Sequence, residues 1–411
     1  MRPLRKLVVT AAALLLVPLA PAAVPASAEP SFGPDWVGTW AVAVTPPGTS
    51  GLSATGVTDK TLRQVAHLSV GGSELRLRLS NVYGTTPLKV GKVTVTPRAD
   101  ALAGTPTVDP SKLKPVTFNG QSAVTIPVGT EWVSDPVRLH VPDDTDLVIS
   151  TYFPGPTGPL TQHPAGYATG FQAGGDQTGE AGPSYTAIPG AARYVIEGVD
   201  VKSRVRGSVV LFGDSITDGV VSPIDKNLRY PDQLADRLLA QPAWRELGVL
   251  NAGISGNRLL ANAGTAGDSA LARFDRDVLG QTSARSVVLL EGINDIGNSR
   301  GATDPAELIA VHRQFIQRAR EAGLKVFGAT LTPYEGAGYY SVEGEADRQA
   351  LNQWIRTSGE YDGVVDFDKA VRDPASPGRM LPAYDVGDHL HPNAEGFKAM
   401  AAAFDLAALS R

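Results

Sequence analysis

Four short blocks in the second half of the chain carry the side chains that acyl transfer requires. In order they read Gly213-Asp214-Ser215-Ile216, Asn251-Ala252-Gly253-Ile254-Ser255-Gly256, Glu291-Gly292-Ile293-Asn294-Asp295 and Gly387-Asp388-His389-Leu390-His391. They offer a serine hydroxyl as nucleophile, a loop glycine and an amide as oxyanion donors, a histidine as base and a carboxylate to orient the base. This combination predicts a serine hydrolase.

Each block follows or lies near a predicted strand, so that residues far apart in the sequence can converge. The apolar run at residues 209–212 ends in the turn that presents Ser215. Ligands of open parallel sheets bind beyond the carboxyl ends of the strands, where the strand-to-helix loops gather. Ser215, Gly256 and Asn294 all lie in such loops, and the segment around His391 precedes the final helix. We therefore expect the four blocks to meet at one edge of a sheet.

The pattern of the sequence changes near residue 203. Beyond it, apolar runs alternate with helical stretches, which indicates parallel strands covered by helices on both faces. The runs lie at residues 209–212, 248–251, 286–290, 325–330 and 363–367. One helix is expected to begin after Asp304 as its N-cap, with Pro305 at the first position and Gly323 at its end. The last helix is expected at residues 393–409.

Residues 36–201 follow a two-residue period instead. Alternating apolar and polar residues at 75–79, 137–141 and 147–153 predict half-buried strands. Gly71-Gly72, between residues 67–70 and residues 74–76, predicts the turn of a hairpin. Strands about ten residues apart without a convincing helix indicate an antiparallel β-sandwich. The Gly- and Pro-rich residues 154–192 are expected to form long loops on this sandwich or part of the junction.

A basic and apolar leader opens the chain. Three basic residues precede an apolar stretch at residues 7–20, and Ala26-Ser27-Ala28 has the form of a secretory cleavage site. We expect residues 1–28 to be a signal peptide and the protein to be secreted. The alternative is an N-terminal anchor helix, but three prolines within residues 18–25 interrupt it and the apolar run is short for a membrane span.

Length and charge limit the class of protein. A chain of 411 residues is long enough for two domains, and we expect an accessory β-sandwich domain at residues 29–202 and a hydrolase domain at residues 203–411. Loss of residues 1–28 removes three of 37 Lys and Arg residues and none of 42 Asp and Glu residues, leaving a formal charge of 34 minus 42, or −8. This acidity argues against nucleic acid as a partner and against attraction to an anionic bilayer. The chain has no cysteine, which excludes disulfides and thiolate chemistry.

The four blocks resemble those of the SGNH hydrolases, also called the GDSL esterase and lipase superfamily. In this chain Ile216 stands where the GDSL name has Leu, and the residues that match the name SGNH are Ser215, Gly256, Asn294 and His391. The resemblance covers about residues 206–411. It implies a flavodoxin-like three-layer α/β/α fold with a parallel sheet. The whole chain is similar to secreted bacterial members that carry a β-rich domain ahead of the hydrolase.

The resemblance also implies a role for each matched residue. Ser215 is then the nucleophile, His391 the general base that later protonates the leaving alcohol, and Asp388 the carboxylate that holds the imidazole in its productive tautomer. The backbone N–H groups of Ser215 and Gly256 and the side-chain amide of Asn294 form the oxyanion hole. The implied reaction is hydrolysis of a carboxylic ester through an acyl-enzyme, with no cofactor and no metal ion.

Residues close to these blocks are candidates for further roles. His389 lies two residues from His391 and is the main alternative as the base. The candidate substrate-binding residues are Asp214, Arg258, Tyr334 and Tyr339. The tyrosines follow the strand that ends near residue 330, and they suit either sugar stacking or an acyl wall. For Asp214 the alternative is hydrogen bonding to the turn around the nucleophile, and for Arg258 it is a solvated surface position.

Two other functions stay open at this point. One is a polysaccharide O-acetylesterase whose sandwich domain presents the glycan to the site. The other is a non-catalytic carbohydrate-binding protein. The expected partner is an ester substrate, which is a small acyl ester, a lipid or an acetylated glycan, and we expect a monomer without stable membrane insertion.

Overall fold

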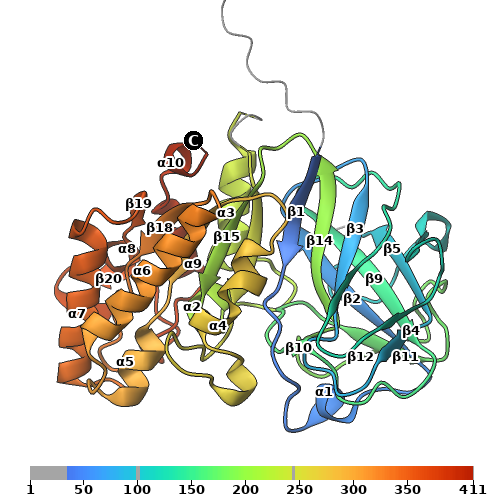
Figure 1. Cartoon of the computed structure of the whole chain (residues 1–411), viewed down its shortest axis with the longest axis horizontal. Helices are drawn as coiled ribbons and strands as arrows, with labels where there is room; N and C mark the ends of the chain where they lie inside the picture. The colour runs from blue at the N-terminus through green and yellow to red at the C-terminus, as the bar shows by residue number, and fades with distance from the viewer. Residues whose placement is uncertain (1–34, 99–101, 243–245, 411) are drawn as a thin grey trace, which may run out of the picture. The chain divides into compact units, whose positions relative to one another are not determined.

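The computed structural model describes residues 35–98, 102–242 and 246–410 (Figure 1). The expected signal peptide at residues 1–28 lies outside the described residues. Up to residue 203 the sheets are antiparallel, and from residue 208 the chain builds a parallel sheet with helices. Each part has its own main apolar core.

Two larger antiparallel sheets make up the N-terminal half. In spatial order the first contains β1 (Asp35–Ala41), β14 (Ile196–Ser203), β3 (Leu75–Ser80) and β8 (Glu131–Val133). The second contains β12 (Thr186–Ala187), β11 (Phe171–Gly174), β2 (Lys60–Leu68), β9 (Thr145–Phe153), β5 (Lys92–Pro97) and β6 (Lys114–Val116). Leucines of β3 and β9 meet in one core between the two sheets, which confirms the expected antiparallel sandwich.

Shorter elements complete this half. They are α1 (Gly51–Thr55), η2 (Pro110–Lys112), the pair β4 (Leu88–Val90) and β7 (Val124–Ile126), and the pair β10 (Gln162–His163) and β13 (Arg193–Tyr194). Three short strands, β10, β11 and β12, therefore lie within residues 154–192, where the sequence indicated long loops or the junction. Of these, β11 joins the larger sheet by pairing with β2.

The expected hairpin at Gly71-Gly72 is wrong. Strands β2 and β3 on either side of it lie in different sheets, so the segment between them crosses from one sheet to the other. A Cβ on Gly71 would overlap the carbonyl oxygen of Val141, and a Cβ on Gly72 would lie 2.7 Å from the carbonyl oxygen of Lys202. The two glycines thus permit close backbone packing.

The strand expected at residues 137–141 is also wrong. Only Val137 and Val141 form isolated bridges, and the residues between them are unpaired with any strand. Pro136 and Pro142 flank the segment, and a proline cannot donate a ladder hydrogen bond. The alternating apolar residues therefore indicate that two valines are buried, and the segment does not pair as a continuous strand.

The C-terminal half is built on a five-stranded parallel sheet. In spatial order its strands are β16 (Gly248–Gly253), β15 (Ser208–Gly213), β17 (Ala284–Leu290), β18 (Lys325–Ala329) and β19 (Gly363–Val365). All five correspond to the apolar runs of the sequence. Every residue of β15 and β16 is buried, as expected for parallel strands covered on both faces.

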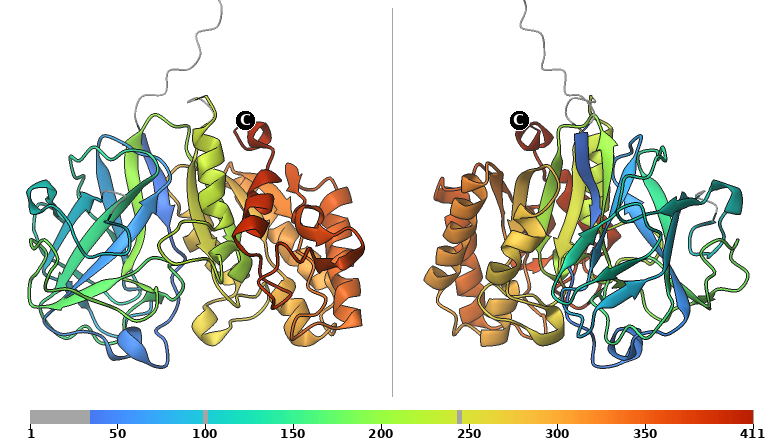
Figure 2. Two further views of the ribbon diagram at one scale, coloured as in Figure 1. Left: turned by 180° about the vertical axis from the view of Figure 1, so that it is seen from behind. Right: turned by 45° about the vertical axis from the view of Figure 1, so that its right-hand side comes forward.

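Helices cover both faces of this sheet (Figures 1 and 2). One face carries α3 (Tyr230–Leu239), α8 (Phe367–Val371), α9 (Ala394–Ala402) and α10 (Leu406–Leu409), with α3 and α9 side by side. The other carries α4 (Ala270–Phe274), η5 (Asp275–Leu279) and α6 (Pro305–Glu321), where the rings of Phe212, Phe274 and Phe315 pack together. The remaining elements are α2 (Ser215–Asp218), η4 (Gly264–Ala266), α5 (Ile293–Ser299), α7 (Val342–Thr357), β20 (Arg372–Asp373) and β21 (Ser376–Met380). The α/β class is confirmed.

Helix boundaries agree with the sequence at one end of the domain and differ at the other. Asp304 caps α6 as expected, because its carboxylate accepts a hydrogen bond from Ala306 N at 2.8 Å. The single helix expected at residues 393–409 is wrong, since two helices occupy this range. Asp405 accepts hydrogen bonds from the backbone N–H groups of Ala407 and Ala408 and so starts a new helix.

Strand β1 lies against β16, the edge strand of the parallel sheet. The backbone N–H of Val249 in β16 donates to Ser69 Oγ at 2.9 Å, and a Cβ on Gly248 would overlap the carbonyl oxygen of Gly38. The N-terminal half therefore covers this edge. A domain boundary near residue 203 stays a prediction.

Candidate active site

The turn after β15 presents Ser215. Strand β15 ends at Gly213, where a side chain would overlap Thr217 Oγ1, and α2 begins directly at Ser215. Asp214 between them caps the helix, because its Oδ1 accepts a hydrogen bond from Ile216 N at 2.9 Å. The backbone N–H of Ser215 belongs to the first turn of α2, where N–H groups have no acceptor within the helix. Both the hydroxyl and this N–H therefore lie at the carboxyl end of the central strands.

The imidazole of His391 connects Ser215 to Asp388. Its Nε2 lies 2.9 Å from Ser215 Oγ, and its Nδ1 lies 2.6 Å from Asp388 Oδ2. Because a carboxylate only accepts, the Nδ1 hydrogen points to Asp388 and Nε2 is left to accept the serine proton. The side chain of His391 is mostly buried, and Ser215 is 6% exposed.

Asp388 is held in place by the segment that follows it. Its Oδ1 accepts hydrogen bonds from the backbone N–H groups of Leu390 and His391, each at 2.9 Å. Partial burial opposes ionisation, but the hydrogen bonds from His391 and Leu390 outweigh it and keep the pKa of Asp388 below its usual value. The carboxylate is therefore charged when it faces the imidazole.

His389 points elsewhere. Its Nδ1 lies 2.7 Å from Asp385 Oδ2, and its side chain is 53% exposed. A Cβ on Gly336 would lie 2.9 Å from the His389 ring, so the ring packs on the loop after β18. Of the two histidines, His391 is the one within hydrogen-bond distance of Ser215.

The other two blocks lie beside each other. Asn294, in the first turn of α5, donates from Nδ2 to the carbonyl oxygen of Asn257 at 2.9 Å. Gly256, directly before Asn257, is exposed and has a φ of 78°, a left-handed conformation that glycine adopts without strain. The Asn294 amide carries a second N–H that is not needed for this bond. Glycine and amide thus meet at one loop after β16.

Comparison with family models agrees with this geometry. Residues 211–399 match the GDSL-like Lipase/Acylhydrolase family, and this segment contains all four blocks. Residues 211–399 form a GDSL-like lipase/acylhydrolase domain. The family is one of carboxylic ester hydrolases. The expected SGNH family is confirmed for this part of the chain.

Solved structures similar to the GDSL domain cover about half of the chain. A GDSL-like lipase from Bacteroides thetaiotaomicron is 23% identical over 49% of this chain and 87% of its own, with a TM-score of 0.38. An acetylxylan esterase from Geobacillus stearothermophilus is 21% identical over 48% and 91%, with a TM-score of 0.37. An α/β hydrolase from the metagenome of Lake Arreo is 23% identical over 49% and 94%, with a TM-score of 0.38. A search of curated proteins found no match.

A buried arginine that the sequence analysis missed connects the strand ends of the GDSL domain. Arg273 of α4 donates to the carbonyl oxygens of Gly213 at 2.9 Å and Ala252 at 2.8 Å, and to Asn257 Oδ1 at 2.9 Å. It also pairs with Glu291 at 3.1 Å. One guanidinium thus ties together the ends of β15, β16 and β17. The sequence signal is a single charged residue inside an apolar helix segment.

Asp295 holds the loop that follows Gly256. Its carboxylate oxygens accept hydrogen bonds from the backbone N–H groups of Leu259 at 2.8 Å and Leu260 at 3.1 Å. The sequence analysis did not single out this residue. Asp295 neighbours Asn294 in α5, so two adjacent side chains fix the Gly256 loop from the same helix.

Acidic groups near Ser215 resist ionisation. Complete burial raises the pKa of Asp214 to about 7, with a further rise from Asp295 that opposes the hydrogen bond from Ile216 N–H. Burial also raises the pKa of Glu291 well above its usual value, and Asp214 contributes to this shift. Part of the negative charge near Ser215 is thereby removed at neutral pH.

The structure separates the four candidate substrate-binding residues. Asp214 and Tyr334 are completely buried, which leaves them no surface for a ligand, and Asp214 instead caps α2. Tyr339 is half-buried and its hydroxyl lies 3.4 Å from Asn294 Oδ1. Arg258 is half-buried beside the Gly256 loop. Only Tyr339 and Arg258 keep accessible surface near the site.

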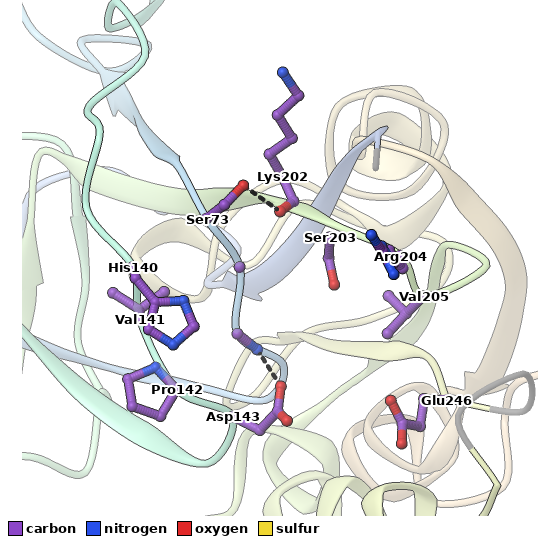
Figure 3. Close-up of a pocket in the computed structure, with 12 residues that line it drawn as sticks. Ser73, His140, Val141, Pro142, Asp143, Lys202, Ser203, Arg204, Val205 and Glu246 are labelled. Carbon is purple, nitrogen blue, oxygen red and sulfur yellow. Dashed lines mark hydrogen bonds between the residues drawn. The ribbon is translucent and has the colours of Figure 1, made fainter. Parts of the chain in front are cut away.

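A cavity of about 620 Å³ lies away from these residues (Figure 3). It is formed by the segment between β2 and β3, by residues 140–143, by the end of β14 with Arg204, and by Glu246. Asp143 accepts a hydrogen bond from Gly71 N on its wall. None of the four blocks lines it.

The described residues contain neither a metal-binding cluster nor a helix that could span a membrane. Within residues 35–98, 102–242 and 246–410, no three His, Cys, Asp or Glu side chains are grouped so that they could hold a metal ion. None of the helices in these ranges combines the length and apolar character needed to cross a membrane.

Proposed function

We propose that this protein hydrolyses carboxylic esters through an acyl-enzyme formed on Ser215. The observation that carries the proposal is the hydrogen-bonded chain from Ser215 through His391 to Asp388, with distances of 2.9 Å and 2.6 Å. Nucleophile, base and orienting carboxylate are thus within reach of one another without rearrangement.

The geometry supports a two-step reaction. Ser215 Oγ attacks the ester carbonyl carbon while its proton passes to His391 Nε2, and Asp388 stabilises the imidazolium. The tetrahedral intermediate then breaks its bond to the alcohol, which leaves with the proton from His391. A water molecule repeats the sequence on the acyl-enzyme, again losing its proton to His391, and releases the carboxylic acid and free Ser215.

The intermediate carries a negative oxygen that needs donors. The N–H groups of Ser215 and Gly256 and the free N–H of the Asn294 amide are proposed to supply them. The hydrogen bond from Asn294 to the Asn257 carbonyl holds the amide beside Gly256. Donors fixed before the reaction stabilise the developing charge without reorganisation, which is where most of their effect arises.

The substrate is proposed to be a small acyl ester, a lipid ester or an acetylated glycan. We also propose that the protein is secreted after loss of residues 1–28, that it acts as a monomer and that it needs no metal ion. A profile of rates over synthetic esters of increasing acyl length, measured beside acetate release from acetylated xylan, distinguishes an esterase or lipase from a polysaccharide O-acetylesterase. Equal rates with and without a chelator test metal independence.

A fluorophosphonate probe tests the acyl-enzyme directly. Wild-type protein is expected to be labelled on Ser215 and to lose its esterase activity as labelling proceeds. Ser215→Ala is expected to be silent in both assays, while Ser222→Ala, a buried serine outside the triad, retains labelling. A folded wild-type protein that stays unlabelled, or that is labelled at another residue, contradicts the proposal.

A further inference from the structure

A histidine from the N-terminal half reaches the helix that begins at the nucleophile. His163, the last residue of β10, places its Nε2 3.1 Å from Asp218 Oδ1, and Asp218 is the last residue of α2. The other ring nitrogen, Nδ1, lies 2.7 Å from the carbonyl oxygen of Ala43. The side chains of His163 and Asp218 are 2% and 1% exposed, so water does not compete for these bonds.

Asp218 also contacts the loop that contains Gly256. Its second oxygen, Oδ2, accepts hydrogen bonds from Ser255 N at 3.0 Å and from Ser255 Oγ at 2.6 Å. Ser255 directly precedes Gly256, whose N–H is a proposed oxyanion donor. A continuous series of hydrogen bonds therefore runs from His163 through Asp218 to the residue that sets the position of this donor.

Whether both hydrogen bonds of the His163 ring form depends on where the protons lie. Both ring nitrogens face oxygens that accept, so both bonds form only when the ring carries two N–H hydrogens or when Asp218 itself holds a proton. In the first case a buried imidazolium balances a buried carboxylate, which is costly to leave unpaired. Without His163, Asp218 keeps only the two donors of Ser255.

The same half also fixes the loop that follows α2. Asp225 accepts hydrogen bonds from Thr169 N at 2.7 Å and from Thr169 Oγ1 at 2.5 Å, and its own N–H donates to the carbonyl oxygen of Tyr167. Val221 in this loop has a φ of 65°, a strained conformation for a β-branched residue. Contacts from residues 163–169 therefore hold α2 and the loop that leaves it.

We propose that His163 is a positioning residue for ester hydrolysis, which acts through Asp218 to hold Ser255 and the N–H of Gly256 at the distance from Ser215 that the oxyanion requires. The N-terminal half thus completes the active site of the GDSL domain. This inference rests on the proposed function of Ser215 and Gly256. It assigns to the β-rich half a part in catalysis beyond covering the edge of the sheet.

Two substitutions at residue 163 separate this role from a structural one. The amide nitrogen of glutamine corresponds in reach to Nε2 of histidine, and that of asparagine to Nδ1. His163→Gln therefore keeps a donor toward Asp218 and loses the bond to Ala43, whereas His163→Asn keeps a donor toward Ala43 and loses the bond to Asp218. Each variant loses one buried hydrogen bond, so similar decreases in thermal stability are expected.

The expected difference is in turnover. His163→Asn should lower kcat by about 10-fold or more with little change in KM. The upper limit is the loss of about 100- to 1000-fold that follows removal of a whole oxyanion donor. His163→Gln should recover most of the wild-type kcat. The rate of labelling by a fluorophosphonate should follow kcat, because phosphonylation uses the same donors. Equal kcat values for the two folded variants would overturn the proposal.

A variant at the other end of the series keeps the test decisive if His163→Asn does not fold. Ser255→Ala removes the 2.6 Å bond from Oγ to Asp218 and leaves the backbone N–H in place. It should lower kcat in the same direction, and a wild-type kcat for this variant would show that Asp218 does not position the loop. Failure of the proposed function has a different result, since wild-type protein would then neither turn over esters nor label at Ser215.

Discussion

The ring of Tyr339 lies directly against the backbone of Gly297, so that a Cβ on residue 297 would overlap Cδ2 and Cε2 of the ring. The Tyr339 hydroxyl lies 3.4 Å from Asn294 Oδ1, one turn earlier in α5. Because the hydroxyl donates to the oxygen of the amide, the amide nitrogen is directed toward Asn257 and the proposed oxyanion site. Because residue 297 has no side chain, the Tyr339 ring can approach α5 closely enough for its hydroxyl to orient the Asn294 amide.

Substitution of Gly297 by alanine should displace the Tyr339 ring. Overpacking of this kind costs about 1–3 kcal/mol of stability, and the loss of the hydroxyl from Asn294 should lower kcat as well. Thermal unfolding measures the loss of stability, and steady-state kinetics measure the effect of moving the Tyr339 hydroxyl away from Asn294. Gly338→Ala is the matched control, because a Cβ there meets no atom within 4 Å, and it should leave both quantities unchanged. Wild-type kcat in a folded Gly297→Ala variant would refute the link.

Removal of the Tyr339 hydroxyl alone separates orientation from packing. Tyr339→Phe keeps the ring against Gly297 and deletes the hydrogen bond to Asn294. Because this bond orients the proposed oxyanion donor, a loss of about 1 kcal/mol of transition-state stabilisation should lower kcat about fivefold. The loss of one hydrogen bond should lower the melting temperature by only a few degrees. A variant with reduced stability and unchanged kcat would assign Tyr339 a packing role only.

Asn294→Ala should lower kcat by about 100- to 1000-fold, since one oxyanion donor is lost. The exposed Asn298 on the same helix provides a control, because its amide donates to the backbone carbonyl oxygen of Asn294 and leaves the Asn294 side chain in place. Asn298→Ala should keep kcat within about twofold, as expected for a surface substitution away from the reacting atoms. Similar kcat values for the two variants would argue against a donor role for Asn294.

The two neighbouring histidines should differ sharply in their contribution to catalysis. His391→Ala removes the group that contacts both Ser215 and Asp388. The value of kcat should therefore fall by about 100- to 10,000-fold. His389→Ala removes an exposed side chain that pairs with Asp385, and activity should stay near the wild-type value. A larger loss at His389 than at His391 would reverse the assignment of the base.

Stability should depend on pH through His67, which lies between two carboxylates. Its Nε2 is 3.0 Å from Asp144 and its Nδ1 is 2.9 Å from Asp146. Burial alone would lower the pKa of His67, but the hydrogen bonds to Asp144 and Asp146 raise it to about 10. The raised pKa means that this stabilisation is complete below about pH 6.5, the value of an unperturbed histidine, and is lost as the pH rises through about 10.

His67→Gln should therefore be less stable than wild type near about pH 6, and the difference should shrink toward about pH 10. Urea unfolding at several pH values within this window measures the change. The exposed His140 supplies the control, and His140→Gln should follow the wild-type curve. A constant difference between wild type and His67→Gln across the window would show that the charge of His67 does not contribute.

The sequence pointed to candidate reacting residues more readily than to the residues that contact them. Ser215, Asn294 and His391 could be named as candidates because each lies in a short block after a strand or before a helix, and strand ends in a parallel sheet converge. Arg273 and His163 could not be found in this way. Their roles depend on which carbonyl and carboxylate oxygens approach them in the folded chain, and no local pattern records that approach.

Errors in the fold have a similar origin. Gly71-Gly72 indicated a tight turn, but the glycines are needed because Val141 and Lys202 come close to the backbone from distant parts of the chain. The last helix divides because Asp405 competes for the backbone N–H groups that follow it. Long apolar strands were located correctly, since burial on both faces leaves an uninterrupted local signal.

The hydroxyl of Ser69 affects whether the GDSL domain can be isolated from the rest of the chain. It occupies the outward-facing N–H of Val249 on an edge strand that would otherwise attract a strand from another molecule. A GDSL domain excised near residue 203 would lose this partner together with the covering strand β1. Self-association along the bared strand would then accompany the loss of the His163 contact to Asp218 in the isolated fragment.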